Sequence, residues 1–219
     1  MEPLLLVLGA YLLGSVPSGY LLVRACRGVD VRAQGSHGIG AINVCRVGGL
    51  GLGVLTLLAD TGKGTVAVLA ARALTSDPWP ICAAALAVLL GHAFSIWLLL
   101  KEGHFSEGKC VASALGVLLG LGLVGELPWS AVLAPVGVWG IGLLLPRVLT
   151  GRWWCVSPAT IAATLAIPLA VHLAHPAPAY RLLAGLMAAL ILVRHKENLR
   201  RLRAGTEPGI PSLHLSRRA

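Results

Sequence analysis

Residues 50–74 read LGLGVLTLLADTGKGTVAVLAARAL, a run that is apolar except at a few positions near its middle. A helix needs about 20 apolar residues to cross the hydrocarbon core of a bilayer, so this run predicts a transmembrane helix. Asp60 and Lys63 are three residues apart and share one helix face. Each charged group costs at least about 2.5 to 3.5 kcal/mol to insert into lipid. We therefore expect this face to contact protein, as an ion pair that braces the bundle or as part of a polar site.

Apolar runs of this kind recur along the whole chain. Seven of them cover residues 4–23, 50–74, 81–100, 111–124, 129–149, 158–173 and 180–193, and the fourth, sixth and seventh are shorter than a full span. The chain is 56% hydrophobic and only 12% charged, whereas soluble proteins average roughly 25% charged residues. We predict an all-α, polytopic membrane protein with about seven transmembrane helices. It would consist of one domain over residues 1–204 and a cytoplasmic tail over residues 205–219.

The positive charges predict which way the helices cross. Cytoplasmic loops collect Lys and Arg, and with seven spans one side of the membrane receives 15 of the 18 basic residues. These residues are Arg24, Arg27, Arg32, Arg46, Lys101, Lys109, Arg147, Arg152, Arg194, Lys196, Arg200, Arg201, Arg203, Arg217 and Arg218. Arg72 and Arg181 fall on the other side, and Lys63 lies within a span. We therefore expect the N-terminus outside and the C-terminus in the cytoplasm.

Composition excludes several other classes of protein. The five cysteines are odd in number and form no C-x-x-C pair, which indicates neither a disulfide framework nor a zinc site. Aromatic residues make up 5% of the chain, and no basic segment alternates with them as in a single-strand binder. The net charge of +9 is therefore assigned to topogenic loops or to an anionic substrate, and not to nucleic acid. Met1-Glu2-Pro3 lacks the basic region of a cleaved signal peptide, so the first apolar run is expected to remain as a span.

The first cytoplasmic segment contains the glycine-rich stretch GSHGIGAINVCR at residues 35–46. Glycines allow backbone N–H groups to approach an anion closely, and Ser36, Asn43 and Arg46 add side-chain donors. We expect a loop here, which either binds a phosphate or simply connects two helices.

Two further polar segments are expected at the same membrane face. Gly108 and Lys109 precede the fourth run, where helix N–H groups and an ammonium could meet a phosphate, although the segment has no Walker A pattern. His92 lies within the third run and has the usual features of a hydrogen-bonded core histidine. His195 and Asn198 share a helix face in a basic segment that either rests on anionic lipid or binds a substrate. Three such clusters at one face favour a substrate site.

These segments resemble the bacterial acyl-phosphate:glycerol-3-phosphate acyltransferase (PlsY) family over nearly the whole chain. The matching pieces are GSVPSGY at 14–20, the stretch 35–46, Asp60 with Lys63-Gly64, GHAF at 91–94, and the segment from Arg194 to Glu207. The resemblance implies an enzyme of the bacterial inner membrane, active at its cytoplasmic face. It implies transfer of a fatty acyl group from acyl phosphate to the 1-hydroxyl of glycerol 3-phosphate, giving lysophosphatidic acid for phospholipid synthesis. It further implies no cofactor, no metal and no acyl-enzyme, and the chain has no G-x-S-x-G elbow.

Carried over by position, the resemblance also implies roles for individual residues. Catalysis would involve His195, Ser36 and Lys109. The substrates would be bound by Gly35, Ser36, Asn43, Arg46, Gly108, Lys109, His195 and Asn198, and the site would be supported by Asp60, Lys63, His92, Glu197 and Arg201. The hydroxyl proton would pass to a substrate phosphate oxygen or to His195. Binding both anions in line would supply most of the acceleration, because an acyl phosphate is already activated.

The sequence departs from the family pattern in two places. The pattern G-S-G-N-I-G-A-T-N appears as G-S-H-G-I-G-A-I-N, so His37, Gly38 and Ile42 differ. The K-G-G-K-G-V-A-T loop is stretched into residues 101–113, with Glu107 and Cys110 where glycines are expected. A carboxylate beside a phosphate is repulsive, and a side chain in place of glycine hinders close backbone approach.

Three other functions remain open from the sequence. A family paralogue with altered or lost activity would account for the departures. A small-anion transporter would account for charged groups inside a span, and a non-catalytic lipid-bound scaffold would account for the basic tail. Transport needs a polar path to the outer face, whereas nearly all polar groups are expected at the inner one. This distribution favours the enzyme.

Overall fold

The computed structural model is a bundle of helices, and it describes residues 3–103, 108–150, 155–175 and 177–209. No strand occurs in these ranges. The elements are α1 (Pro3–Ser15), α2 (Ser18–Arg27), the short 3-10 helix η1 (Val31–Ala33), α3 (Ala41–Gly48), α4 (Leu50–Leu74), α5 (Pro78–Ala93), α6 (Ile96–Glu102), α7 (Val111–Leu123), α8 (Trp129–Thr150), α9 (Ser157–Ala174), α10 (Pro178–Arg194) and α11 (Lys196–Arg203). The prediction of an all-α protein is confirmed over the described residues.

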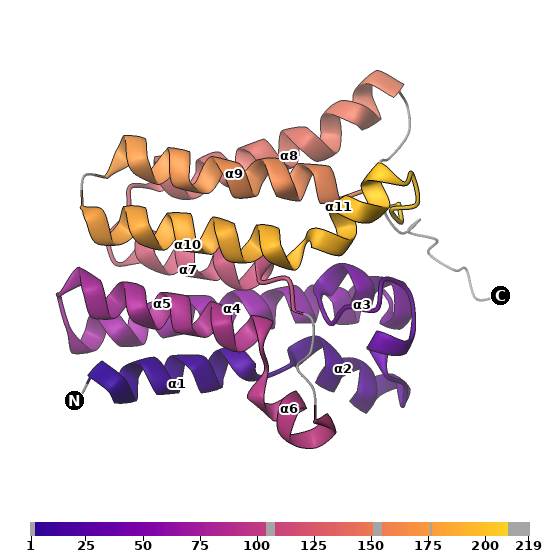
Figure 1. Cartoon of the computed structure of the whole chain (residues 1–219), viewed down its shortest axis with the longest axis horizontal. Coiled ribbons are helices and arrows are strands. Elements are labelled where there is room, and N and C mark those ends of the chain that lie inside the picture. The colour runs from indigo at the N-terminus through magenta and orange to yellow at the C-terminus, as the bar shows by residue number, and fades with distance from the viewer. Residues whose placement is uncertain (1–2, 104–107, 151–154, 176, 210–219) are drawn as a thin grey trace.

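The long helices run side by side, and most of the short ones gather at one end of the bundle (Figure 1). Figure 1 shows α2, α3 and α11 at the right-hand end, opposite the start of α1, and α6 below the bundle. Five segments of the described chain are long and apolar enough to cross a membrane, namely Leu4–Arg27, Leu50–Leu74, Pro78–Lys101, Trp129–Thr150 and Ser157–Ala174. Large apolar side chains are exposed along these segments, for example Leu58, Ile141 and Leu169. In water such a surface would be unstable, so the structure supports an integral membrane protein.

Each predicted apolar run coincides with one helix or with two helices separated by a short break. The runs 50–74 and 111–124 match α4 and α7 almost residue for residue. The first run is broken at Val16-Pro17, because proline cannot continue the hydrogen-bond ladder of α1. The third is broken at Phe94-Ser95, where the Ser95 hydroxyl donates to the Ser15 carbonyl and its oxygen caps α6. The two breaks therefore lie side by side and turn α2 and α6 away from the bundle.

Glycines allow the central helices to pack closely. A Cβ at Gly64 would collide with the Ser113 carbonyl, and one at Gly116 would collide with the Thr61 carbonyl, so α4 and α7 approach backbone to backbone. Small residues serve this purpose at helix interfaces in membranes. The close contact of α4 and α7 brings the middle of α4, including its charged pair, to the start of α7.

Several residues used in the sequence argument lie outside the described ranges. They are Met1, Glu2, Glu107 and Arg152, and positions 210–219 of the expected tail, which include Arg217 and Arg218.

Candidate active site

A cavity of about 370 Å³ lies among α3, α4 and α7 on one side and α8, α9, α10 and α11 on the other. The predicted site residues that line it are Ser36, Asn43, Arg46, Asp60, His92, Lys109, His195 and Asn198. They come from five separate parts of the chain. Gly35, Lys63, Gly108, Glu197 and Arg201 are not among the lining residues.

Asn43 organises the glycine-rich stretch through its amide. Its Oδ1 accepts from the Ser36 backbone N–H at 2.7 Å, and its Nδ2 donates to the carbonyls of Val31 and Gly38 at 2.9 and 2.8 Å. A third acceptor is the Gln34 carbonyl. Both polar atoms of this buried amide are thus used within the protein, which makes Asn43 a positioning residue for the backbone around Ser36.

The expectation of a loop through Arg46 was wrong in its second half. Residues 41–48 form α3, because Gly40 is extended at the N-cap and Val44 on the following turn is fully buried against α2 and η1. The helix start, Gly40-Ala41-Ile42, lines the cavity. The first half is a true loop in which Gly35 has a φ of +65° and lies so close to Asn43 Oδ1 that a Cβ would not fit.

His195 lies at the junction between α10 and α11. Its Nδ1 is 2.8 Å from the Ile191 carbonyl, which can only accept a hydrogen bond, so Nδ1 carries the proton. Burial lowers the pKa of His195, the hydrogen bond to Ile191 partly opposes this, and nearby Lys109 lowers it further. The ring is therefore neutral at pH 7, and its Nε2 has a free lone pair with which to accept a proton.

Asn198 and Glu207 hold each other in place one turn further on. Asn198 Nδ2 donates to Glu207 Oε1 at 2.6 Å and to Ser157 Oγ at 3.0 Å, and Ser157 Oγ in turn donates to Glu207. Arg201 Nε donates to the other carboxylate oxygen at 2.8 Å. Because a carboxylate only accepts, the orientation of the amide is fixed with Oδ1 on the opposite side. Asn198 Oδ1 is buried and has no hydrogen-bond partner within the described part of the chain.

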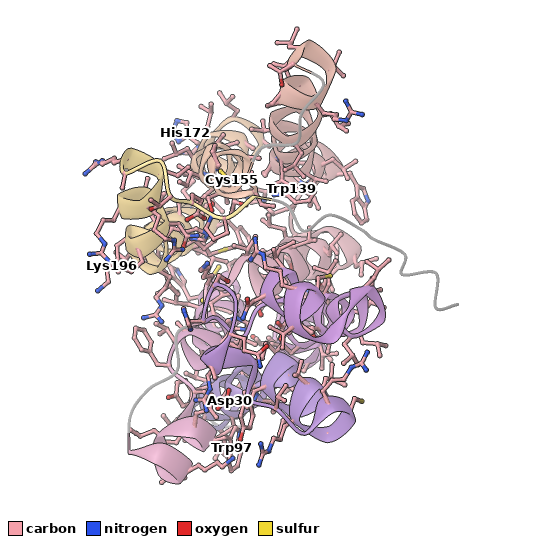
Figure 2. All side chains as sticks on the ribbon, turned by 90° about the vertical axis from the view of Figure 1, so that its right-hand side faces the viewer. Asp30, Trp97, Trp139, Cys155, His172 and Lys196 are labelled. Carbon is pink, nitrogen blue, oxygen red and sulfur yellow. The ribbon has the colours of Figure 1, made fainter. Side chains whose placement is uncertain are left out.

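Glu207 remains ionised in this setting. Desolvation alone would raise its pKa, but the hydrogen bonds from Ser157, Asn198 and Arg201 together lower it below the ordinary value. Two residues later, the Gly209 carbonyl accepts from Arg46 Nη2 at 3.0 Å. The start of the expected tail therefore returns to the cavity and bridges α11 and α3. Figure 2, which views this end of the molecule, shows Lys196 at its outer edge.

Of the charged pair of α4, Asp60 lines the cavity and Lys63 does not. Lys63 Nζ is 2.9 Å from Asp60 Oδ1 and donates to the Val16 carbonyl at 3.2 Å, and both side chains are almost fully buried. The expectation that this helix face contacts protein is confirmed. His92 Nδ1 lies 3.8 Å from Asp60 Oδ1 and 3.1 Å from Ser113 Oγ. The pair thus joins α4, α5 and α7.

Lys109 is presented by a short segment that packs on His92. Gly108 lies so close to the backbone and ring of His92 that a Cβ would not fit, and its carbonyl accepts from Arg194 Nε at 2.9 Å. Lys109 follows and lines the cavity, and Cys110 begins α7. Arg194 and His92 thereby fix the segment that carries Lys109, which lines the same cavity as Arg46 and His195.

Two described residues, His37 and Cys110, stand where the family pattern has glycine, and both keep a backbone conformation that is typical of glycine. His37 has a φ of 60° and Cys110 a φ of 63°, which is the left-handed region that favours glycine. His37 is exposed, with Nδ1 2.9 Å from the Arg32 carbonyl, and the Cys110 thiol donates to the Leu89 carbonyl. The loop conformation that a glycine would adopt is therefore retained in this chain.

Some of the site was missed by the sequence argument. Ser157 and Glu207 were given no role, although Glu207 is the only acid after Glu197 in a strongly basic segment, which is a usable signal. Glu197 pairs with Arg200 at 2.9 Å on the outside of α11 and takes no part in the cavity lining. The apolar half of the cavity, on α7, α8 and α9, has no signal in the sequence beyond hydrophobicity.

The cavity has a cationic polar end and an apolar end within a lipid-facing helical bundle. This combination defines an integral membrane protein whose site can hold a molecule that is part anion and part hydrocarbon. Comparison with known proteins agrees, because residues 4–205 match the family model for glycerol-3-phosphate acyltransferase. The chain belongs to this family, and the resemblance seen in the sequence is confirmed.

Individual relatives match over almost their whole length. The glycerol-3-phosphate acyltransferase of Synechococcus sp. (strain JA-3-3Ab) is 40% identical over 211 residues, which is 96% of this chain and 94% of the relative. The one from Geobacter sulfurreducens is 42% identical over 209 residues, or 94% and 97% of the two chains. The crystal structure of PlsY, an integral membrane glycerol 3-phosphate acyltransferase, in its glycerol 3-phosphate form superimposes with a TM-score of 0.82. It is 35% identical and covers 95% of this chain and 96% of its own.

Proposed function

We propose that this protein transfers a fatty acyl group from acyl phosphate to the 1-hydroxyl of glycerol 3-phosphate and releases lysophosphatidic acid and inorganic phosphate. The observation that carries the proposal is the single cavity in which Arg46, Lys109, His195 and Asn198 meet an apolar chamber. Acyl transfer to glycerol 3-phosphate is the activity by which the family is named. The family name does not specify the acyl donor, and we assign that role to acyl phosphate.

Two phosphate groups would bind at the cationic end. Arg46 and Lys109 supply positive charge, and the first residues of α3 and α7 line the same cavity with their N-terminal ends. Helix N-termini carry partial positive charge and unpaired N–H groups, so they favour phosphate. Ser36, whose backbone is fixed by Asn43, adds a hydroxyl. An incoming phosphate would compete with the Gly209 carbonyl for Arg46.

The acceptor alcohol would be oriented by the α10–α11 junction. Asn198 Oδ1 is a buried acceptor without a partner in the described residues, so a glycerol hydroxyl that donates to it would satisfy it. The neutral His195 lies one turn before Asn198 and can accept a proton at Nε2. Together they would hold the glycerol so that its 1-hydroxyl faces the acyl carbonyl.

The reaction then needs one displacement. The 1-hydroxyl oxygen attacks the acyl carbonyl carbon, the bond from that carbon to the phosphate oxygen breaks, and phosphate leaves with the electron pair. The hydroxyl proton passes to His195 or to an oxygen of the leaving phosphate. Lys109 and Arg46 stabilise the negative charge that develops on the phosphate, and this electrostatic effect is usually the largest contribution of such a site.

The membrane placement is part of the proposal. We propose seven spans in the bacterial inner membrane, with the N-terminus outside, the cavity mouth in the cytoplasm, and a domain over residues 1–204 followed by the tail 205–219. The basic residues support this, because Arg27, Arg46 and Lys109 belong to the end of the bundle opposite Arg72 and Arg181. Soluble glycerol 3-phosphate would then arrive at the polar end, and the acyl chain would lie among the helices.

The test is a reconstituted assay with two donors. Purified protein in lipid nanodiscs receives labelled glycerol 3-phosphate with either acyl phosphate or the corresponding acyl thioester. We expect lysophosphatidic acid and phosphate in equal amounts from acyl phosphate, and little product from the thioester. Arg46→Gln should lose most activity, whereas the matched variant Arg24→Gln, on the exposed side of α2, should retain it. Equal use of both donors, or no product from well-folded protein, would refute the proposal.

A further inference from the structure

The cavity continues past the polar groups into a chamber between α7, α8 and α9. On α9 its lining follows one helix face through Ser157, Thr160, Thr164 and Ile167. At 1.5 Å rise per residue, the ten steps from Ser157 to Ile167 cover about 15 Å. Ser157 belongs to the polar end through its bonds to Asn198 and Glu207, so Ile167 marks the far end.

One wall of this chamber is a tryptophan held in a fixed position. Gly142 of α8 packs directly on Ala159 of α9, because a Cβ at position 142 would lie only 2.9 Å from the Ala159 Cβ. Trp139 is one turn earlier on α8 and therefore lies level with the middle of the chamber. Trp139 Nε1 donates to Thr160 Oγ1 at 3.2 Å. Figure 2 labels Trp139 on this α8–α9 side of the molecule. The indole therefore narrows the chamber beside the path of an acyl chain.

The far end of the chamber is closed by the hydrophobic core. Leu118 of α7 is 3% exposed and Ile167 of α9 is 5% exposed, and both line the cavity and belong to the core cluster. Behind them the same cluster continues with Leu121, Val132 and Val171, each exposed by 1% or less. Close-packed cores leave few voids larger than a water molecule, so the side chains at this end of the chamber cannot move aside for a longer acyl chain.

The side of the chamber is more open than its floor. Leu57 of α4 and Val136 of α8 also line the cavity, yet they are 42% and 40% exposed. Exposure of lining residues on two facing helices fits a cavity that opens to the lipid-facing surface between them. An acyl chain can therefore enter sideways from the bilayer between α4 and α8, after which its end meets either the floor or this side opening.

We propose that Ile167 and Leu118 form the floor of the acyl chamber and set the chain length that the enzyme prefers. The inference rests on the proposed function, because it assigns the apolar end of that same cavity. A C–C bond of about 1.5 Å gives roughly 1.3 Å per carbon along an extended chain, so about 15 Å holds on the order of 12 carbons. The terminal carbons contact Ile167 and Leu118, and each carbon beyond this length must bend toward the side opening.

The proposal predicts opposite shifts for smaller and larger residues at the floor. Purified variants in nanodiscs receive saturated acyl phosphates of increasing length, and kcat/KM is measured for each. Ile167→Ala should move the optimum to longer chains, and Ile167→Phe should move it to shorter ones. One methylene of fit in an apolar pocket changes kcat/KM by about 10-fold or more, so the ratio between neighbouring chain lengths should change by about that factor.

A matched control and a milder variant keep the test decisive. Leu165→Ala, on the same helix but 56% exposed to lipid, should leave the length profile unchanged. Ile167→Val removes one methylene and should shift the profile in the same direction as Ile167→Ala, which matters if the alanine variant folds poorly. If Ile167→Val and Ile167→Phe are both active and both keep the native dependence of kcat/KM on chain length, the floor assignment is wrong. That result would indicate that acyl chains leave by the side opening. Failure of the native protein with every chain length would instead overturn the proposed function.

Discussion

His195 combines burial with a fixed tautomer, and this combination predicts a pH profile. Its pKa is lowered by burial, so it lies below the ordinary value of about 6.5 and the neutral base is present above that pH. Activity should therefore be lost only as pH falls through the lowered pKa, below about pH 6.5. His195→Ala should lower kcat by about 100-fold or more and remove this acid limb. His172→Ala, which is exposed at the other end of α9, is the control.

An unchanged kcat and an unchanged acid limb in His195→Ala would contradict the role of this ring. The hydroxyl proton would then pass to the phosphate of the acyl donor. The rest of the site would still stand, because Arg46 and Asn198 act on other atoms of the substrates.

Asn198 should act on the binding of glycerol 3-phosphate. Asn198→Ala removes the buried acceptor that we assign to a glycerol hydroxyl, and one such hydrogen bond is worth about 1 to 3 kcal/mol. The KM for glycerol 3-phosphate should therefore rise roughly 10- to 100-fold, while the KM for the acyl donor changes little. Lys196→Ala on the outer side of α11 should leave both constants near their native values. Equal increases in both KM values would show that Asn198 only stabilises the fold.

Asp60 and Lys63 should matter chiefly for stability. Asp60→Ala leaves the buried ammonium of Lys63 without its carboxylate, and breaking a buried pair costs about 3 to 5 kcal/mol. Thermal unfolding in detergent should show a large decrease for this variant. Asp60→Leu combined with Lys63→Met should recover most of the loss, since no charge then remains buried. A native unfolding temperature for Asp60→Ala would mean that the pair is not the brace inferred here.

At the residue scale, the sequence could predict which residue types gather but not which atoms they use. Asn43 was expected to bind substrate, yet its amide is consumed by the loop it anchors. Glu207 had no predicted role, because its partners Ser157 and Asn198 are 50 and 9 residues away in the chain. Such contacts depend on how helices are placed in space, which local patterns do not encode.

At the element scale, the hydrophobic runs predict which segments form helices, whereas residues such as Pro17 and Ser95 determine where the helices break. The apolar runs predicted α4, α7 and α8 to within a residue or two. The runs did not reveal α3, because eight residues with glycines on both sides resemble a loop when read alone. That helix is stabilised by the burial of Val44 against α2 and η1 and by the packing of Cys45 on Gly53 of α4, and these are tertiary contacts.

The glycine contact between α4 and α7 predicts a contrast between two substitutions. Gly116→Ala places a Cβ against the Thr61 carbonyl and should destabilise the protein by about 1 to 3 kcal/mol, as overpacking does. Gly185 lies within α10 with nothing within 4 Å of a built Cβ, so Gly185→Ala should be neutral or stabilising by up to about 1 kcal/mol. Thermal unfolding of both variants in detergent measures the difference. A Gly116→Ala variant as stable as Gly185→Ala would contradict the close packing.

At the scale of the whole molecule, the polar site residues lie at one end of the bundle and the apolar chamber extends along its middle. Figure 1 shows α2, α3 and α11 gathered at the end where Arg46, Lys109 and His195 line one cavity. The sequence predicted this gathering from charge alone, because basic loops share one side of a membrane. The cavity itself could not be predicted, since it arises where α8 and α9 stand apart from α4 and α7.

The most direct measurement follows labelled glycerol 3-phosphate added to proteoliposomes that contain acyl phosphate in the bilayer. An acyltransferase should convert the label into lysophosphatidic acid in the lipid, with one phosphate released per product, and should leave the lumen free of label. A transporter would instead deliver unchanged glycerol 3-phosphate to the lumen. Label in lysophosphatidic acid, abolished by Arg46→Gln, is the result that we predict. Unchanged label in the lumen, or no conversion by folded protein, would contradict the central claim.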